Sequence, residues 1–131
     1  MENDDFHLAA IGQVALTVSD LDRSVTFYRD ILGLPFLFAA PPGLAFFRCG
    51  TVRIMLGTAA QSGTEEKFTA ALYFRVDDIQ RSAEVLTERG VSFERGVHLV
   101  ASLADHDLYM AFFRDPDRHL LALMCEQAKR A

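Results

Sequence analysis

The chain repeats itself, and this internal repeat limits its fold more than any other feature of the sequence. Residues 13–24 align with residues 71–82, and Asp, Arg and Ser are identical near the ends of the two stretches. Further on, the run Ala-Phe-Phe-Arg occurs at residues 45–48 and again at residues 111–114. Because the matches keep the same order, a duplicated unit of about 60 residues explains them better than chance does.

Each unit begins with a β-rich run that ends at an Asp able to cap a helix, Asp20 in the first unit and Asp78 in the second. Apolar residues then recur at spacings of three and four, which predicts one buried helix face. A glycine, Gly33 or Gly90, suits the left-handed position just beyond each helix. Three strands should follow each helix. The sequence therefore predicts an α+β fold made of two βαβββ units, which form a curved, cup-shaped sheet with the helices outside.

The expected boundaries follow from the same patterns. Strands of the first unit are expected near residues 14–18, 35–39, 44–49 and 52–57, and those of the second from residue 71 and near 92–100, 107–114 and 119–125. The run Asp115-Pro116-Asp117-Arg118 predicts a tight turn, because proline fixes one backbone dihedral. We expect one domain over residues 1–131, with repeats at about 11–60 and 68–126 and a polar linker at about 61–67.

Composition excludes several classes of protein. The formal net charge is −5, whereas general nucleic-acid binding requires a basic face. No apolar run approaches the roughly 18–20 residues of a membrane span, and the acidic start is unlike a signal peptide. Cys49 and Cys125 lie in apolar, strand-like runs and are expected to be buried, reduced thiols. We therefore expect a cytoplasmic protein that binds neither nucleic acid nor membranes.

Two stretches of the sequence resemble a known superfamily. They are Val-Ser-Asp-Leu-Asp-Arg-Ser followed by Phe-Tyr-Arg-Asp-Ile-Leu-Gly-Leu within residues 18–34, and Phe-Arg-Asp-Pro-Asp-x-x-x-Leu at residues 113–121. Together with the repeat they are similar to the vicinal oxygen chelate (VOC) superfamily, the group of glyoxalase I, bleomycin-resistance proteins and extradiol dioxygenases. The resemblance extends from about Ile11 to Glu126. It is specific for the fold and weak for the activity, because one fold hosts many chemistries.

The resemblance also implies where a metal would be bound. In enzymes of this family the two units curve into a cup, and side chains from the first and last strands of each unit hold one divalent metal. The corresponding residues here are Gln13, Met55, Ala71 and Ala122. Alanine has no donor atom, and a thioether is a poor ligand for Zn²⁺, Ni²⁺, Mn²⁺ or Fe²⁺. We therefore expect no cofactor at the usual position, and a divalent metal held in another way is the alternative.

Strand alternation predicts which other side chains face the cup. The resulting set is mostly apolar with a few polar anchors, which is typical of small-molecule sites. The ligand-binding candidates are Gln13, Thr17, Arg53, Met55, Tyr73, Arg75, Ala122 and Met124. Because Arg53 and Arg75 belong to this set, an anionic ligand is the preferred interpretation. The alternative is that both arginines lie at strand ends and reach water.

Two histidines and a tyrosine are the candidates for acid–base chemistry. His98 and His106 flank an expected hairpin turn and could meet at the mouth of the cup, and Tyr109 lies in a strand whose alternation the sequence does not fix. The alternative for the histidines is two half-exposed loop residues. His119 should point away from the cup, because it is out of phase with Ala122.

Three functions remain open on the sequence alone. The first is metal-independent binding of a small organic molecule, similar to the bleomycin-resistance proteins. The second is an enzyme related to the lyases, isomerases or dioxygenases of the superfamily, but not a typical glyoxalase I. The third, which we favour least, is a partner-binding dimer with a vestigial pocket. A homodimer is expected in any case, because open sheet edges need to be covered.

Overall fold

The computed structural model describes residues 6–58 and 71–129 and confirms the two βαβββ units. The strands of the first sheet, in spatial order, are β1 (Gln13–Thr17), β4 (Val52–Gly57), β3 (Leu44–Cys49) and β2 (Phe36–Ala40). Those of the second sheet are β5 (Ala71–Arg75), β8 (Leu120–Ala128), β7 (His106–Arg114) and β6 (Arg95–Ser102). In each sheet the first strand runs parallel to the last, and the other pairs are antiparallel. The expected linker at 61–67 lies outside the described residues.

Helical segments connect the first and second strands of each unit. They are α1 (Leu21–Thr26), continued by the π-helical turn η2 (Phe27–Ile31), and α3 (Ile79–Glu88). The predicted caps are confirmed, because Asp20 accepts a hydrogen bond from the Arg23 backbone N–H and Asp78 accepts one from that of Arg81.

The first helical segment differs from the single regular helix that the periodicity predicts. The interval from Asp20 to Gly33 is one residue longer than that from Asp78 to Gly90. A π-helical turn absorbs one additional residue within a helix, so η2 restores the match between the units. Gly33 and Gly90 then adopt the predicted positive φ, at 78° and 99°.

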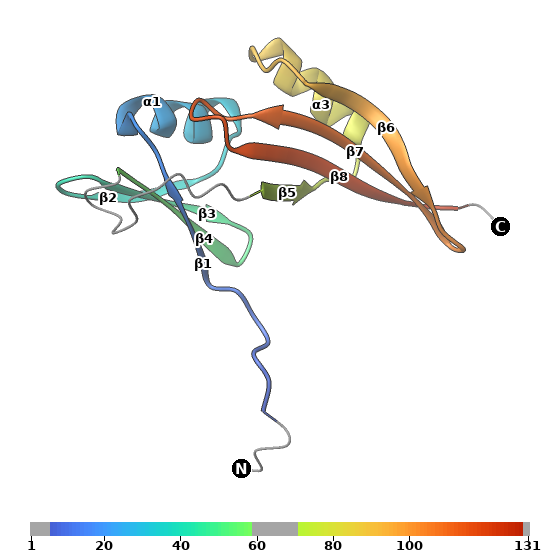
Figure 1. Cartoon of the computed structure of the whole chain (residues 1–131), viewed down its shortest axis with the longest axis horizontal. Helices are drawn as coiled ribbons and strands as arrows, with labels where there is room; N and C mark the ends of the chain where they lie inside the picture. Colours follow the sequence, from blue (N-terminus) through green and yellow to red (C-terminus); the bar gives the residue numbers. More distant parts are fainter. Residues whose placement is uncertain (1–5, 59–70, 130–131) are drawn as a thin grey trace.

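Each sheet is covered by its helix on one face only. Figure 1 shows α1 over the first sheet and α3 over the second, on the same side of the molecule. The buried core lies between helices and sheets, and its largest fully buried side chains are Leu16, Tyr28, Phe47, Leu56, Phe113 and Leu121. We call the helix-free side of each sheet its open face. The open faces are where a cup would form.

Two strand boundaries differ from the expected ones by three residues, and the others by two or fewer. β6 begins at Arg95 rather than near residue 92, because the chain first closes the helix with a hydrogen bond from Val91 N–H to the Leu86 carbonyl. β8 continues to Ala128 rather than ending at residue 125, because its last residue pairs with His106 at the start of β7.

The two cysteines are free thiols with different burial. Cys125 is buried as predicted, but Cys49 is only half-buried, because it stands at the end of β3 beside the turn into β4. Partial burial raises the pKa of the Cys49 thiol. Within residues 6–58 and 71–129, none of the helices is both long and apolar enough to cross a bilayer.

One buried carboxylate joins the two units. Asp115, at the predicted turn between β7 and β8, is 3% exposed and accepts a hydrogen bond of 2.7 Å from the Tyr28 hydroxyl of the first unit. It also accepts one from the His119 backbone N–H at 2.8 Å and one from the Asp117 backbone N–H at 2.9 Å. Its contact with His119 Nδ1 is 2.7 Å. Every lone pair of this buried group therefore has a donor, as a buried charge requires.

The next acid in the same turn fastens the start of the first helix. Asp117 accepts hydrogen bonds from the Ser19 backbone N–H at 2.9 Å and from the Ser24 hydroxyl at 3.3 Å. Its carboxylate also lies 3.9 Å from the Arg23 guanidinium. The β7–β8 turn is therefore both a link between strands and the main polar contact between the two units.

The surroundings of Asp115 and His119 favour an ion pair. Burial alone would raise the pKa of Asp115, but the hydrogen bonds from His119 and Tyr28 outweigh it and hold that pKa below its usual value. The hydrogen bond to Asp115 raises the pKa of His119, although burial opposes the rise. Burial, together with the neighbouring Asp115 carboxylate, keeps Tyr28 protonated by raising its pKa strongly.

The stability of the fold should therefore depend on pH through His119. A group whose pKa is raised on folding stabilises fully below its unfolded pKa, about 6.5 for histidine, and this contribution is lost as pH rises through the folded pKa. We predict that the unfolding free energy of the wild type falls between pH 6 and pH 8, and that His119→Gln removes most of this fall. Denaturant unfolding at the two pH values measures it. His98→Gln is the control and should keep the wild-type pH dependence; an unchanged slope in His119→Gln would contradict the prediction.

Candidate functional site

The open face of the first sheet carries a row of polar side chains at one end. Gln13, Arg53 and Arg48 lie side by side on β1, β4 and β3, because they are direct partners in the registers of these strands. The neighbouring row is apolar and runs Ala15, Met55, Phe46 and Phe38 across the four strands. Strand alternation thus places Gln13, Arg53 and Met55 on the face that the sequence predicts.

Arg53 is held in position by its neighbours. Its Nε donates a hydrogen bond of 2.7 Å to Gln13 Oε1, and its guanidinium lies 5.1 Å from the centroid of the Phe46 ring. The Gln13 amide nitrogen lies 3.9 Å from the Met55 sulfur. Among residues 6–58 and 71–129, the terminal nitrogens of Arg53 have no hydrogen-bond acceptor, so within this part of the chain the guanidinium is oriented and its outer donors are available.

Arg48 places a second guanidinium directly opposite Arg53. Like charges at paired positions of a sheet repel one another. The equivalent arginine of the second unit, Arg114, is neutralised by Glu94, at 3.1 Å, and donates to the Arg118 carbonyl. In the described part of the chain, neither Arg48 nor Arg53 has an acidic partner. An otherwise acidic protein therefore has a local positive site on this face.

The open face of the second sheet is aromatic instead. Tyr73 on β5 and Phe112 on β7 are the two register partners of Ala122 on β8. Their rings meet edge to face with centroids 6.3 Å apart. Ala122 is fully buried beneath them, whereas Tyr73 is 48% exposed. The small alanine therefore forms the floor of an aromatic surface that water reaches.

The next row of this face contains a guanidinium, two thioethers and an imidazole. Arg75, Met124, Met110 and His98 are successive register partners across the second sheet. His98 packs against Phe112, with ring centroids 5.8 Å apart, and its Nδ1 lies 2.7 Å from the Gly96 carbonyl oxygen. Because a carbonyl oxygen can only accept, His98 Nδ1 carries a proton in this contact.

The three acid–base candidates do not come together. His98 pairs with Met110, while His106 lies at the start of β7, about 13 Å farther along the strand. His106 Nδ1 is bound to Asp105 at 2.7 Å, a contact that lowers the pKa of that carboxyl. Tyr109 is out of phase with Met110 and packs against the core on the helix side. His98 is therefore the one of these three with access to the aromatic surface.

The donor atoms at the four superfamily metal positions do not suit a divalent ion. Gln13 is the one with an oxygen donor, and that oxygen is already bonded to a cationic guanidinium. Met55 offers a thioether, and Ala71 and Ala122 offer nothing. Among the described residues, His, Cys, Asp and Glu form no cluster of three or more that could hold a metal ion.

The paired sheets and their open faces define a class of βαβββ proteins, and the comparisons place the chain within it. The chain belongs to the Glyoxalase/Bleomycin resistance protein/Dioxygenase superfamily, which matches residues 10–123. An uncharacterized protein of Bacillus subtilis (strain 168), YraH, is 32% identical over 123 residues, covering 85% of this chain and 94% of that protein. This confirms the resemblance that the sequence motifs indicate.

Solved structures agree on the fold. The chain is similar to a lactoylglutathione lyase from Agrobacterium tumefaciens, with a TM-score of 0.76 and 23% identity over 90% of this chain and 94% of that one. It is also similar to TnmS3, an antibiotic binding protein from Streptomyces sp. CB03234, with a TM-score of 0.72 and 19% identity over 93% and 99% of the two chains. An enzyme and a binding protein thus share this scaffold, so the function must be argued from the site.

One residue of these faces, Arg48, is not among the candidates that the sequence predicts, because its Ala-Phe-Phe-Arg run indicates only the duplication. Phe112 lies in the same strand as Tyr109, and the sequence does not fix which face of that strand adds aromatic surface to the cup. The signal that could have found Arg48 is the contrast between the units, since Glu94 partners Arg114 and no acid partners Arg48 among the described residues. Phe112 lies in the apolar run 108–113, where no polar residue marks the alternation.

Proposed function

We propose that the chain binds a small organic carboxylate on the open faces of its sheets, without the metal that enzymes of the superfamily use. The observation that carries the proposal is the Arg48–Arg53 pair. Two adjacent guanidiniums, one oriented by Gln13 and Phe46, lack an acidic partner within residues 6–58 and 71–129. A carboxylate would relieve their repulsion and accept their planar donors.

The second sheet supplies the chemistry for the rest of such a ligand. Tyr73 and Phe112 offer an accessible aromatic surface, and Met110 and Met124 lie beside it. Arg75 stands in the same row and is exposed, so it provides a further cationic anchor. Apolar area with a few fixed polar groups is the usual composition of a small-molecule site. We therefore favour an aromatic or otherwise apolar carboxylic acid.

Binding is favoured over acid–base catalysis because the candidate catalytic groups are separated. Tyr109 lies on the helix side, and His106 is distant from His98 along the sheet. A lyase, isomerase or dioxygenase activity would have to rest on His98, the one of the three candidates that lies beside the aromatic surface, or on a metal bound in a different way. If any turnover of 2-oxoaldehyde–thiol adducts or catechols is found, its loss in His98→Gln would support that alternative.

The anionic preference can be tested by thermal shift. Aromatic and aliphatic carboxylates should raise the melting temperature of the wild type more than matched amines or amides. A charge-assisted hydrogen bond contributes about 1.5–3 kcal/mol, so Arg53→Gln or Arg75→Gln should weaken binding by about ten- to a hundredfold. Ligand at 100 times its Kd adds about 2.7 kcal/mol to folding stability, enough to detect in a melting curve.

Arg29→Gln is the matched control for this experiment. It removes one positive charge from η2, on the helix side, where Arg29 pairs with Asp30 at 2.8 Å. The control should bind carboxylates as the wild type does. The proposal is wrong if amines or neutral compounds stabilise best, or if both open-face variants respond to acids as the wild type does.

Metal content is a separate test. With Gln13 engaged by Arg53, and with alanine at two of the four positions, we predict less than a tenth of an equivalent of Zn, Ni, Mn or Fe after dialysis. Elemental analysis of the purified protein measures it. Glyoxalase I activity should be absent, with or without these metals added. Near one equivalent of any of them would contradict the proposal.

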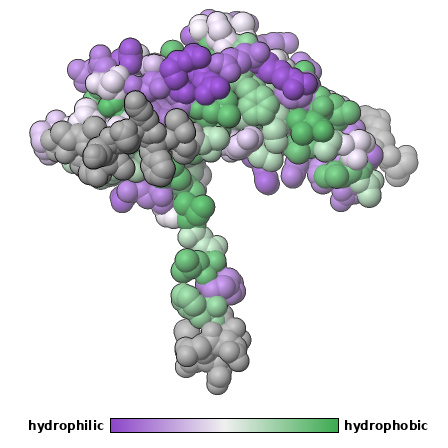
Figure 2. Space-filling model, viewed as in Figure 1, coloured by the Kyte–Doolittle hydropathy of each residue, from purple (hydrophilic) through white to green (hydrophobic). Residues whose placement is uncertain are grey.

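We also propose that the protein is a homodimer that covers its exposed apolar surface. Residues 6–12 extend away from the body (Figure 1), and mostly hydrophobic surface stands clear of it in Figure 2. Phe6, Leu8 and Ile11 are 66%, 88% and 67% exposed. Such a segment is unfavourable in water and suits contact with a second copy. β1 and β5 each have a free edge in the described sheets, which supports pairing.

Light scattering tests the dimer directly. We predict twice the chain mass of 14.6 kDa at micromolar concentration. The triple variant Phe6→Ser, Leu8→Ser, Ile11→Ser should shift the protein towards the monomer while leaving its circular dichroism unchanged, because these side chains contribute no buried core. A wild-type mass of 14.6 kDa would refute the dimer.

A further inference from the structure

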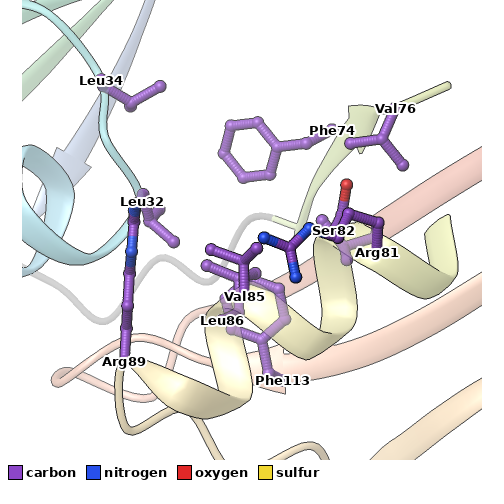
Figure 3. A pocket seen from close by; sticks show the side chains of 11 residues that line it. Leu32, Leu34, Phe74, Val76, Arg81, Ser82, Val85, Leu86, Arg89 and Phe113 are labelled. Atoms are coloured by element: carbon purple, nitrogen blue, oxygen red, sulfur yellow. The ribbon is translucent and has the colours of Figure 1, made fainter. Parts of the chain in front are cut away.

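A pocket of about 280 Å³ lies on the helix side, away from the open faces, where the two units meet. Its apolar walls come from both units, with Leu32 and Leu34 on one side and Phe74 on β5 opposite them (Figure 3). Arg81 and Ser82 of α3, together with Arg89 just after its end, supply its polar groups. A concave apolar space with a few polar groups is the usual form of a ligand site.

The internal repeat indicates which kind of group these polar side chains could bind. Arg81 and Ser82 are the equivalents of Arg23 and Ser24 in the first unit. There, Ser24 donates a hydrogen bond to the Asp117 carboxylate and Arg23 pairs with it. The same Arg-Ser pair, at the same place on its helix, therefore already binds a carboxylate in the first unit.

In the second unit this carboxylate partner is missing from the described residues. The Ser82 hydroxyl has no hydrogen-bond partner among them, and the one acid that the Arg81 guanidinium pairs with there is the exposed Glu84, at 3.8 Å. The connection between β3 and β4, which corresponds to the Asp115–His119 turn, consists of Gly50 and Thr51. This two-residue connection is too short to place a carboxylate beside the helix of the other unit, as the longer Asp115–His119 turn does.

The apolar part of the pocket has the same origin. Val85 and Leu86 stand where the first unit has Phe27 and Tyr28, so smaller side chains replace two buried aromatic rings. Space that the rings and the docked turn fill in the first unit is left open by the described residues of the second. The pocket can thus be understood as the empty counterpart of a contact that the molecule makes elsewhere.

Arg89 closes the far end of the pocket. Its Nη1 donates a hydrogen bond of 2.9 Å to the Ile31 carbonyl at the end of η2, which ties α3 to the first unit. Figure 3 shows Arg89 beside Leu32, and the Ser82 hydroxyl directed towards β5, where Phe74 and Val76 lie. In the same view the Arg81 guanidinium lies between Phe74 and Val85, on the side of Ser82.

We propose that this pocket is a second ligand site, distinct from the open faces, for a small carboxylate with an apolar or aromatic body. The carboxylate takes the role that Asp117 plays in the first unit and accepts from Ser82 and Arg81. The body fills the space beside Val85, Leu86 and Phe74. The exposed Arg81–Glu84 pair is weak, because both side chains are well solvated, so Arg81 can turn to the ligand. This inference does not depend on the function proposed for the open faces.

Methyl NMR of the full chain separates the two sites. Phenylacetate is the probe, with phenylacetamide and phenethylamine as the uncharged and cationic analogues. We expect saturable shifts of the Leu32, Val76, Val85 and Leu86 methyls with phenylacetate, and at least tenfold weaker binding of both analogues. Shifts of the Met55, Met110 and Met124 methyls report the open faces independently.

Two variants test the assignment of residues. Ser82→Ala should weaken phenylacetate binding at the Leu32 and Val85 methyls by about tenfold, because a hydrogen bond to a charged group is lost. Val85→Phe copies the side chain of the first unit into the pocket and should abolish those shifts. Arg53→Gln is the matched control, since it lies on an open face and should leave them unchanged.

The pocket methyls and the methionine methyls test the pocket site and the open-face site separately. If the pocket methyls do not respond to phenylacetate, or respond equally to phenylacetamide, the pocket is not a carboxylate site, whatever happens at the methionines. If Ser82→Ala and Val85→Phe both bind as the wild type does, the assignment is also overturned. Loss of the methionine shifts in Arg53→Gln with the pocket shifts intact would support both sites.

Discussion

The buried carboxylate of Asp115 is the contact on which the arrangement of the two units depends. It is one charge, almost fully removed from water, and it is compensated by donors from both halves of the chain, including Tyr28 from the first unit. Removing one partner of such a pair leaves the other charge buried and typically costs about 3–5 kcal/mol. The turn that carries Asp115 also brings Asp117 to the start of α1. The two motifs that identify the superfamily, around Tyr28 and Asp115, are therefore two sides of one interface.

Duplication gives the molecule two copies of one scaffold, and the differences between the copies are where its chemistry lies. On the open faces, the small Ala15 of the first sheet corresponds to the exposed ring of Tyr73 in the second. At the helices, one unit receives an acidic turn and the other has a pocket. Arg114 is neutralised by Glu94, whereas Arg48 is left beside Arg53. At the helices and at these arginines, one unit has a filled or neutralised position, and the equivalent position of the other unit lacks that partner among the described residues.

The same comparison explains why the superfamily alone does not assign a function. A lyase and an antibiotic binding protein have folds similar to this one. The scaffold fixes which positions face the cup, and the side chains at those positions decide the chemistry. Here Gln13 contacts a guanidinium, and Ala122 lies beneath two aromatic rings. For these reasons we propose recognition of an organic anion rather than coordination of a metal.

The sequence by itself determined the two βαβββ units, their helix caps, their glycine stops and the inward face of most strands. Each of these follows from local patterns, because a cap, a left-handed glycine and an alternating strand are decided by neighbours in the chain. It did not determine the face of Tyr109, since the apolar run 108–113 has no alternation to read. Nor could it show the π turn as such, although the additional residue between Asp20 and Gly33 marks its place.

Only the tertiary structure decided that Asp117 docks against Ser24 while Ser82 faces a pocket, and that Arg48 stands opposite Arg53. Those pairings join residues distant in the chain, and the packing of whole elements sets them.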